Sequence, residues 1–290
     1  MRRLHLFTVA VALAISSAGL AQVAEPPQQN TVEILSGRLH LKASLWRPAS
    51  RGPFPAVVFN HSRSDTARQN QVQLGLTLEQ IAQVLGPVFV RHGFVFLCPF
   101  RRGEGSSADQ GPFIGDLLQR EEAAKGPEAR RRLQLALLTT DHLQDALAGL
   151  SFLKSLPYVD ARRVAVAGHS FGGQLTLLEA SRDRTVRAAV TFGAAAGSWD
   201  ESSELRDRLI ETLRALSVPV MLIQAANDYS LSPSTAMERE LSRLSKPHAR
   251  KIYPAFGDTP AHGHNFLYFD IARWEQDVFA FLEANVTRRN

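Results

Sequence analysis

Short apolar runs alternate with longer amphipathic segments along most of this chain. The runs are rich in valine, alanine and phenylalanine, which is typical of strands buried on both faces. We expect such strands at 56–59, 94–98, 163–167, 186–192 and 218–225, and a final strand at 250–253. Helical spacing of apolar residues predicts helices, one of them irregular near Thr139, at 74–85, 127–156, 204–216, 235–244 and 271–286. Strands that alternate with helices predict an α/β fold, a mainly parallel twisted sheet with helices on both faces.

The N-terminal part of the pattern is different. Residues 31–47 alternate between apolar and polar positions and break at Gly37, which predicts an antiparallel hairpin at one edge of the sheet. Residues 22–30 are polar and contain prolines, so we expect a flexible leader there. Residues 108–126 have mixed polarity with scattered glycine and proline, and we expect a mobile loop or a small lid. The pattern over 31–290 shows no repeat, and we expect a single domain.

The first residues have the pattern of a targeting segment. Arg2 and Arg3 precede a mostly apolar stretch at 4–20, and small residues end at Ala21. This arrangement predicts a signal peptide over 1–21, with cleavage three residues later as a second option. An uncleaved membrane anchor is the alternative, but the apolar run is short for a span. We therefore expect export to the periplasm or beyond the cell, with no stable membrane span after cleavage.

Composition and charge narrow the classes of protein. The chain has 290 residues, 44% of them apolar, and a net charge of +5 without a long run of one sign. This content supports a large core and excludes a disordered chain. The triplet 130–132 is all arginine, but it lies in a helical pattern and is typical of a solvated face, so we expect no nucleic-acid partner. The single cysteine, Cys98, excludes an intramolecular disulfide and lies in an apolar strand, where we expect a buried thiol.

The spacing Gly168-x-Ser170-x-Gly172 lies between a predicted strand and an apolar segment at helical spacing. Strand, sharp turn and helix form the context of a nucleophile elbow, in which small residues let the helix approach the strand closely. A serine hydroxyl is a weak nucleophile at neutral pH and needs a base, which in turn needs an orienting group. Ser170 is therefore the candidate nucleophile.

In this architecture the acid and the histidine follow the serine in that order. Asp228 is the first carboxylate after the strand at 218–225. Two histidines, His262 and His264, follow the last predicted strand. We prefer His264 as the base, because Phe266 two residues on can wedge the loop, and His262 stays the alternative.

A pair of histidines in the pattern His-x-His also suits a metal ion. Asp258 and Asp270 lie near this pair in the sequence. The chain supplies no second cluster of histidine or cysteine ligands, so we expect no metal and no cofactor.

Backbone N–H groups must stabilise the oxyanion of a tetrahedral intermediate. One is expected from Phe171, the residue after the nucleophile, and the other from the loop after 56–59, where Arg63 is our candidate. His169 precedes the nucleophile, and we expect it to pack at the elbow with its side chain pointing away from Ser170.

These residues together resemble the α/β-hydrolase superfamily, in particular its dienelactone-hydrolase-like and prolyl-oligopeptidase-like branch. The matching motifs are Asn60-His61-Ser62, Arg102-Gly103-Glu104-Gly105-Ser106, Asp145, Gly168-His169-Ser170-Phe171-Gly172-Gly173, Asn227-Asp228 and His264-Asn265-Phe266. By this resemblance Ser170 is the nucleophile, Asp228 the acid and His264 the base. Two departures matter: Ser62 stands where the family usually has glycine, and the nucleophile is serine where dienelactone hydrolase has cysteine.

The expected protein is an exported serine hydrolase, most simply a carboxylesterase that acts on small-molecule esters through an acyl-enzyme. A serine peptidase or amidase acting on peptides is the first alternative, and a non-catalytic binding protein on the same scaffold is the second. The sequence assigns no substrate-binding residue, although four aromatic residues are candidates for an apolar pocket. They are Phe100, Phe113, Trp199 and Tyr229.

Overall fold

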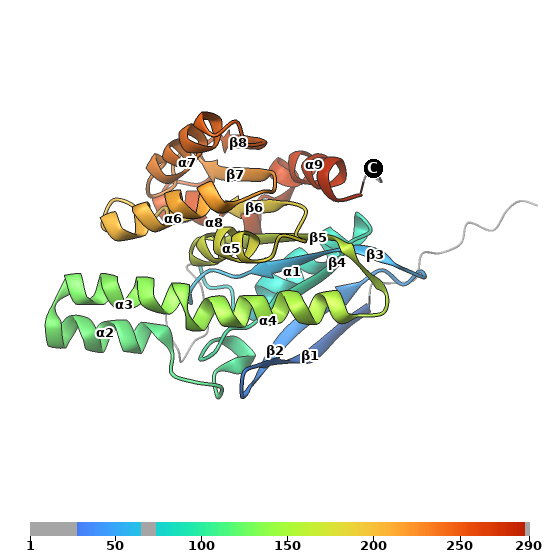
Figure 1. The fold of residues 1–290 in the computed structure, drawn as a ribbon, viewed down its shortest axis with the longest axis horizontal. Helices are drawn as coiled ribbons and strands as arrows, with labels where there is room; N and C mark the ends of the chain where they lie inside the picture. The colour runs from blue at the N-terminus through green and yellow to red at the C-terminus, as the bar shows by residue number, and fades with distance from the viewer. Residues whose placement is uncertain (1–27, 65–73, 288–290) are drawn as a thin grey trace, which may run out of the picture.

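The computed structural model describes residues 28–64 and 74–287, and within them eight strands form one mixed sheet (Figure 1). The predicted signal peptide at 1–21 and most of the predicted leader lie outside the described residues, and the last three residues of that leader, 28–30, belong to a strand that pairs with 45–47 instead of a flexible segment. The strand order is β1-β2-β4-β3-β5-β6-β7-β8. The strands are β1 (Gln28–Ser36), β2 (Leu39–Arg47), β3 (Phe54–Asn60), β4 (Val95–Pro99), β5 (Val159–His169), β6 (Ala189–Phe192), β7 (Val220–Ala225) and β8 (His248–Tyr253).

Strands β3 to β8 are parallel, whereas β1 and β2 form an antiparallel hairpin that joins the sheet beside β4. Ala56 and Val58 of β3 join one apolar core and Val57 and Phe59 join the other, so this strand is buried on both sides. This burial explains the continuous apolar runs, because a strand covered on both faces has no polar side. The predicted α/β fold with an N-terminal edge hairpin is confirmed.

Helices cover both faces of the sheet (Figure 1). One core contains side chains from α2 through α7, and the other contains those from α1, α8 and α9. The helices are α1 (Leu78–Arg91), α2 (Ile114–Lys125), α3 (Pro127–Thr139), α4 (Asp141–Ser155), α5 (Phe171–Arg182), α6 (Ser203–Ala215), α7 (Ser232–Arg243), α8 (Pro260–Phe269) and α9 (Ile271–Leu282), with a 3₁₀ turn at Gly105–Ser107 and a π-helical turn at Glu283–Thr287. No described helix has the length and apolar character that a membrane crossing requires.

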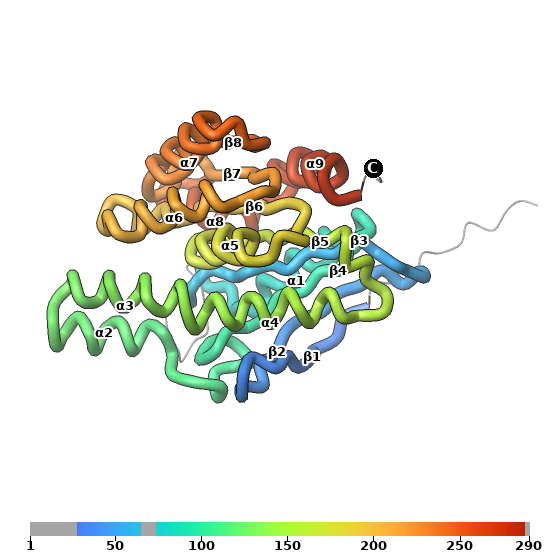
Figure 2. The backbone as a smooth tube through the Cα atoms, in the orientation of Figure 1, coloured from blue at the N-terminus to red at the C-terminus, as the bar shows by residue number. Residues whose placement is uncertain are grey.

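Helices α2 and α3 form an antiparallel hairpin that projects beyond the sheet (Figures 1 and 2). The expectation of a loop over 108–126 is wrong for its second half, because α2 is regular and packs Ile114 and Leu118 into the core. The irregularity predicted near Thr139 is confirmed. The helix breaks at Thr140, with φ −120° and ψ −92°, and α4 begins at the next residue.

Helix α1 runs longer than the sequence pattern predicts. The pattern predicts a helix that ends at residue 85, before Gly86-Pro87, yet α1 passes through both residues to Arg91. A proline inside a helix costs about 3 kcal/mol. Burial of Val88 and Phe89 against the sheet offsets this cost, and Gly86 lets the helix lie against the Trp46 ring, which a Cβ atom would approach to 2.5 Å.

Candidate active site

Ser170 lies at the sharp turn between β5 and α5. Its backbone adopts φ 55° and ψ −115°, a conformation that L side chains rarely adopt, and its N–H donates to the carbonyl of Phe192 at 2.8 Å. A Cβ atom on Gly168 would lie 2.5 Å from the carbonyl oxygen of Gly172, and one on Gly172 would lie 2.0 Å from that of Asn60. Glycine at both positions therefore permits the strained turn that presents the serine.

Asp228 and His264 form a buried hydrogen-bonded pair. Asp228 follows β7 and His264 lies in α8, and the His264 Nδ1 and Asp228 Oδ1 atoms are 2.7 Å apart. The amide of Tyr229 donates to Asp228 Oδ1 and the side chain of Gln224 donates to Oδ2. These donors fix the carboxylate, which in turn orients His264 with its proton on Nδ1 and leaves Nε2 as the basic atom.

The loop after β6 closes over this pair. Gly193 has φ +55°, and a Cβ atom there would lie 3.0 Å from both Asp228 Oδ2 and the His264 ring. His262, the alternative base, lies at the first turn of α8, where its Nδ1 faces the Thr259 hydroxyl at 3.1 Å. The structure therefore brings His264, and not His262, to Asp228.

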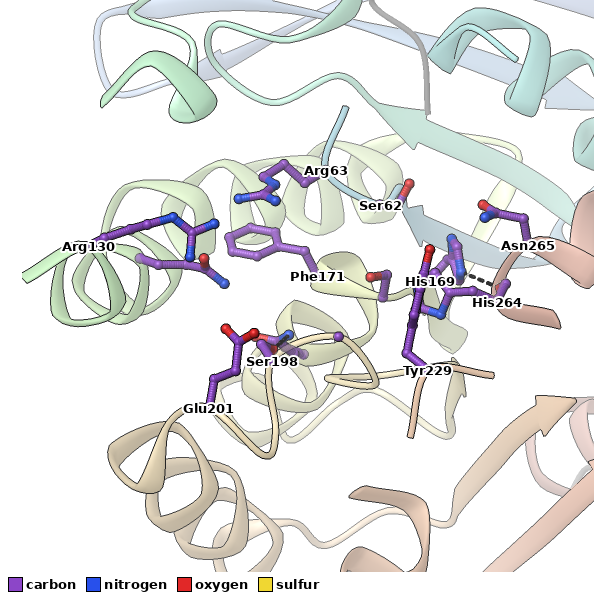
Figure 3. A pocket seen from close by; sticks show the side chains of 14 residues that line it. Ser62, Arg63, Arg130, His169, Phe171, Ser198, Glu201, Tyr229, His264 and Asn265 are labelled. Carbon is purple, nitrogen blue, oxygen red and sulfur yellow. Dashed lines mark hydrogen bonds between the residues drawn. The ribbon is translucent and has the colours of Figure 1, made fainter. Parts of the chain in front are cut away.

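His169 packs at the elbow, as the sequence predicts. It also lines the cavity that lies in front of Ser170. Its Nε2 donates to the backbone carbonyl of His264 at 2.8 Å, the contact drawn as a dashed line in Figure 3, and its Nδ1 accepts from the Tyr268 hydroxyl at 3.0 Å. Burial, with a smaller contribution from His264, holds the pKa of His169 well below its usual range. His169 is therefore a neutral support that holds the backbone beneath His264.

A buried arginine holds the loop that follows β3. Arg101 lies just after β4 and donates to the carbonyls of His61 and Ser62 at 2.7 and 3.0 Å. It also forms a fully buried ion pair with Glu104 at 2.8 Å, and Glu104 accepts from the amide and hydroxyl of Ser64. Arg101 is not among the site residues predicted from the sequence, although its place at the carboxyl end of a central strand is a signal of proximity to the site.

This network determines where the expected oxyanion donors lie. Arg63 lies within the loop that Arg101 and Glu104 hold, and Phe171 opens α5, so the helix does not use its amide internally. Both residues line the cavity together with Ser170. Burial, and then the charge of Arg101, lower the pKa of His61 well below its usual range, so this loop carries a neutral imidazole.

A cavity of about 350 Å³ lies in front of Ser170 and His264. Its outer part is lined by Arg130 and Gln134 of α3 and by Ser198 and Glu201 of the loop before α6. Figure 3 shows Arg63, Arg130 and Glu201 around the ring of Phe171. Arg130 is partly exposed, and α3 carries it to the rim of this cavity, a position that the sequence pattern did not indicate.

The expected aromatic pocket is only partly present. Tyr229 lines the cavity, with its ring centroid 5.1 Å from that of His264. The other three candidates, Phe100, Phe113 and Trp199, are buried core residues and do not line it. In the described residues, no three histidine, cysteine or acidic side chains gather where they might hold a metal ion.

A sequence model of the dienelactone hydrolase family matches residues 73–267. No curated protein matches the chain. Among solved structures, the chain is similar to acylaminoacyl peptidase from Pyrococcus horikoshii (TM-score 0.65, 17% identity), over 91% of this chain and 42% of the peptidase. It is also similar to dienelactone hydrolase from Anabaena variabilis (TM-score 0.58, 19% identity), over 90% of this chain and 99% of the other. Esterase Est22 aligns with TM-score 0.61 and 16% identity, over 89% of this chain and 82% of the esterase.

These likenesses show the fold that the solved structures share with the chain. The chain spans only about two fifths of the length of the peptidase, because the alignment covers 42% of that protein. The expected resemblance to the dienelactone-hydrolase-like α/β hydrolases is confirmed by the family match, which covers well over half of the chain.

Proposed function

The chain belongs to the dienelactone hydrolase family, and from this premise we propose that it is a serine esterase that cleaves carboxylic esters through an acyl-enzyme. The observation that supports the proposal is the buried Asp228–His264 hydrogen bond of 2.7 Å beside the strained elbow of Ser170. Ser170 and His264 line one cavity, so a substrate carbonyl there would meet both. This arrangement has the three roles that acyl transfer by serine requires.

In the proposed reaction, Ser170 Oγ attacks the ester carbonyl while His264 Nε2 takes the hydroxyl proton. Asp228 stabilises the imidazolium that forms, and the amides of Phe171 and Arg63 donate to the oxyanion. Collapse of the tetrahedral intermediate breaks the bond to the alcohol, which leaves with the proton from His264. His264 then takes a proton from water, whose oxygen attacks the acyl-enzyme carbonyl. The second tetrahedral intermediate breaks its bond to Ser170 Oγ, which takes the proton from His264 as the acid is released.

The test is hydrolysis of p-nitrophenyl butyrate, together with labelling by a fluorophosphonate probe. The Ser170→Ala variant should lose both signals, whereas the matched control Ser151→Ala should keep them, because Ser151 is exposed on α4 and does not line the cavity. Labelling without ester turnover, combined with cleavage of a p-nitroanilide, would favour the peptidase or amidase alternative. Absence of both labelling and turnover in the wild-type chain would favour a non-catalytic binding protein.

We further propose that the protein is exported. The support is the sequence pattern of 1–21, with two arginines before an apolar stretch that ends in small residues. Expression of the full chain in a Gram-negative host, followed by mass spectrometry of the N-terminus in each fraction, tests this. A mature chain that begins near Gln22 in the periplasm or medium is expected, and a full-length chain in the cytoplasm would contradict it.

A further inference from the structure

Glu179, in the middle of α5, is a buried acid that the proposed reaction does not use. Its side chain is fully shielded from solvent. Oε2 accepts from Asn60 Nδ2 at 2.7 Å, whereas Oε1 has no hydrogen-bond partner among the described residues. The ammonium of Lys154 is bonded to Asp183 and Thr185 instead. A buried carboxylate with a single donor is costly, so this geometry favours the protonated acid.

Glu179 bonds to Asn60, the residue directly before the loop at 61–64 that carries the expected oxyanion donor Arg63. We call this segment the oxyanion loop. Asn60 is the last residue of β3, and its side-chain amide also lies 3.2 Å from the hydroxyl of Thr176. That hydroxyl donates to the carbonyl of Gly172, in the first turn of α5. A Cβ atom on Gly172 would lie 2.0 Å from the carbonyl oxygen of Asn60, so the loop and the helix touch directly. Asn60 therefore sets how the loop lies against the helix that begins after Ser170.

The oxyanion loop is thus held from two sides, by an ion pair on one side and by a hydrogen bond to an unpaired acid on the other. On one side the guanidinium of Arg101 is balanced by Glu104. On the other side Asn60 bonds to Glu179, which has no counter-ion within hydrogen-bond distance among the described residues. The ion pair on the first side is balanced, but an ionised Glu179 would leave an uncompensated charge in the core.

We propose that Glu179 is a positioning residue: as a neutral acid it stays buried, anchors Asn60 and so holds the oxyanion loop in its working shape. Once ionised it has no counter-ion in the core and is relieved only by moving toward water, which takes the acceptor away from Asn60 and loosens that loop. This inference rests on the proposed serine hydrolase function. Loss of oxyanion donors lowers kcat more than it changes KM, because the donors act on the charge that develops in the transition state.

The surroundings of Glu179 indicate when the loop would loosen. Burial raises the pKa of Glu179 to about 8, while the Asn60 hydrogen bond and the charge of Lys154 on α4 lower it and the charge of Asp183 at the end of α5 raises it. Asn60 of β3 carries no charge. The acid therefore loses its proton on the alkaline side of neutrality, and we expect kcat to fall there.

The test compares pH profiles of kcat and KM for p-nitrophenyl butyrate in the wild-type chain and in Glu179→Gln. Glutamine keeps an oxygen acceptor for Asn60 and does not ionise. Above pH 8 the wild-type kcat should fall about tenfold per pH unit, with KM changed less than threefold, a margin of roughly 0.65 kcal/mol in binding. Glu179→Gln should keep its neutral-pH kcat across this range. An unchanged alkaline decline in Glu179→Gln would overturn the inference.

A second pair of variants tests the link to Asn60 and guards against simple misfolding. Glu179→Leu and Asn60→Ser should each lower kcat at pH 7 while thermal unfolding shows a folded chain, and the double variant should lose no more than the worse single one. Additive losses would contradict a shared role. An inert wild-type chain would contradict the proposed function itself, whereas an active chain whose two losses add would contradict only the role of Glu179.

Discussion

The cavity in front of Ser170 has two unlike walls. The inner wall comes from the loops that follow β3, β5 and β7, and the charged groups directly behind it, Asp228 and the Arg101–Glu104 pair, are buried and have fixed partners. The outer wall comes from α3 and the loop before α6, and its charged groups, Arg130 and Glu201, are partly or fully open to solvent.

This difference separates two tasks. Buried, fully bonded groups keep one geometry, which suits a reaction that needs fixed donors and a fixed base. Solvated side chains on a projecting hairpin are weakly held and easily replaced, which suits selection among substrates. Changes to the inner wall should therefore alter kcat and stability, and changes to the outer wall should alter KM.

The largest effect is expected at the histidine pair in α8. His264→Ala should lower kcat by about 10⁴-fold or more, because it removes the base that Asp228 orients. His262→Ala should stay within about threefold, a difference of roughly 0.65 kcal/mol, because His262 contacts Thr259 instead. Steady-state ester hydrolysis measures both variants. A larger loss in His262→Ala than in His264→Ala would identify His262 as the base.

Stability should depend on pH through Glu179. Its pKa rises from 4.5 to about 8 on folding, so the native state keeps a proton that the unfolded chain releases. The free energy of unfolding is therefore highest below pH 4.5 with respect to this group and falls as pH rises to 8, by about 5 kcal/mol. In urea unfolding from pH 5 to 9, Glu179→Gln should lack this decline.

The control for this measurement is Glu211→Gln on the exposed side of α6. This variant should keep the wild-type dependence of unfolding on pH, because a solvated carboxyl has a similar environment in both states. A parallel decline in all three chains would show that Glu179 is not the group responsible.

The buried ion pair of the inner wall gives a smaller change in stability. Arg101→Met leaves Glu104 in the core without its partner and should lower the free energy of unfolding by about 3–5 kcal/mol. Adding Glu104→Gln should recover part of this loss, because it removes the uncompensated charge. Denaturant unfolding measures the cycle, with exposed Arg162→Met as the control. Failure of the second substitution to restore stability would contradict a charge-based origin.

The inner wall was largely predictable from the sequence. Continuous apolar runs mark strands covered on both faces, and parallel strands carry their carboxyl ends to one edge. The segments that contain Ser170 and Asp228 each follow such a run, and the segment that contains His264 follows the parallel edge strand β8. Their approach to one another follows from this topology. The glycines beside Ser170 gave the elbow, because only glycine fits so close to the next turn of helix.

The parts that were missed share one physical reason. A polarity pattern assigns charged residues to solvent, so it cannot show that Arg101 and Glu179 are buried with partners far away in the sequence. Nor does helical spacing show where a projecting hairpin lies, so the sequence did not indicate that α3 carries the partly exposed Arg130 to the cavity. Tertiary contacts decided these positions, as they did when α1 continued through Pro87.

The smallest effect is expected at the rim of the outer wall. Arg130 pairs with Glu122 at 3.3 Å and is about one quarter exposed, so its attraction for a substrate charge is partly screened and amounts to about 1 kcal/mol. Arg130→Gln should therefore raise KM for the p-nitrophenyl hemiester of glutaric acid about fivefold, with little change for p-nitrophenyl pentanoate, which has an acyl chain of the same length. Arg132→Gln is the matched control, because Arg132 is a more exposed arginine of the same helix and does not line the cavity. Equal changes in KM for the two esters, or for the two variants, would show that Arg130 does not attract a charged substrate. The inner wall alone would then select the substrate.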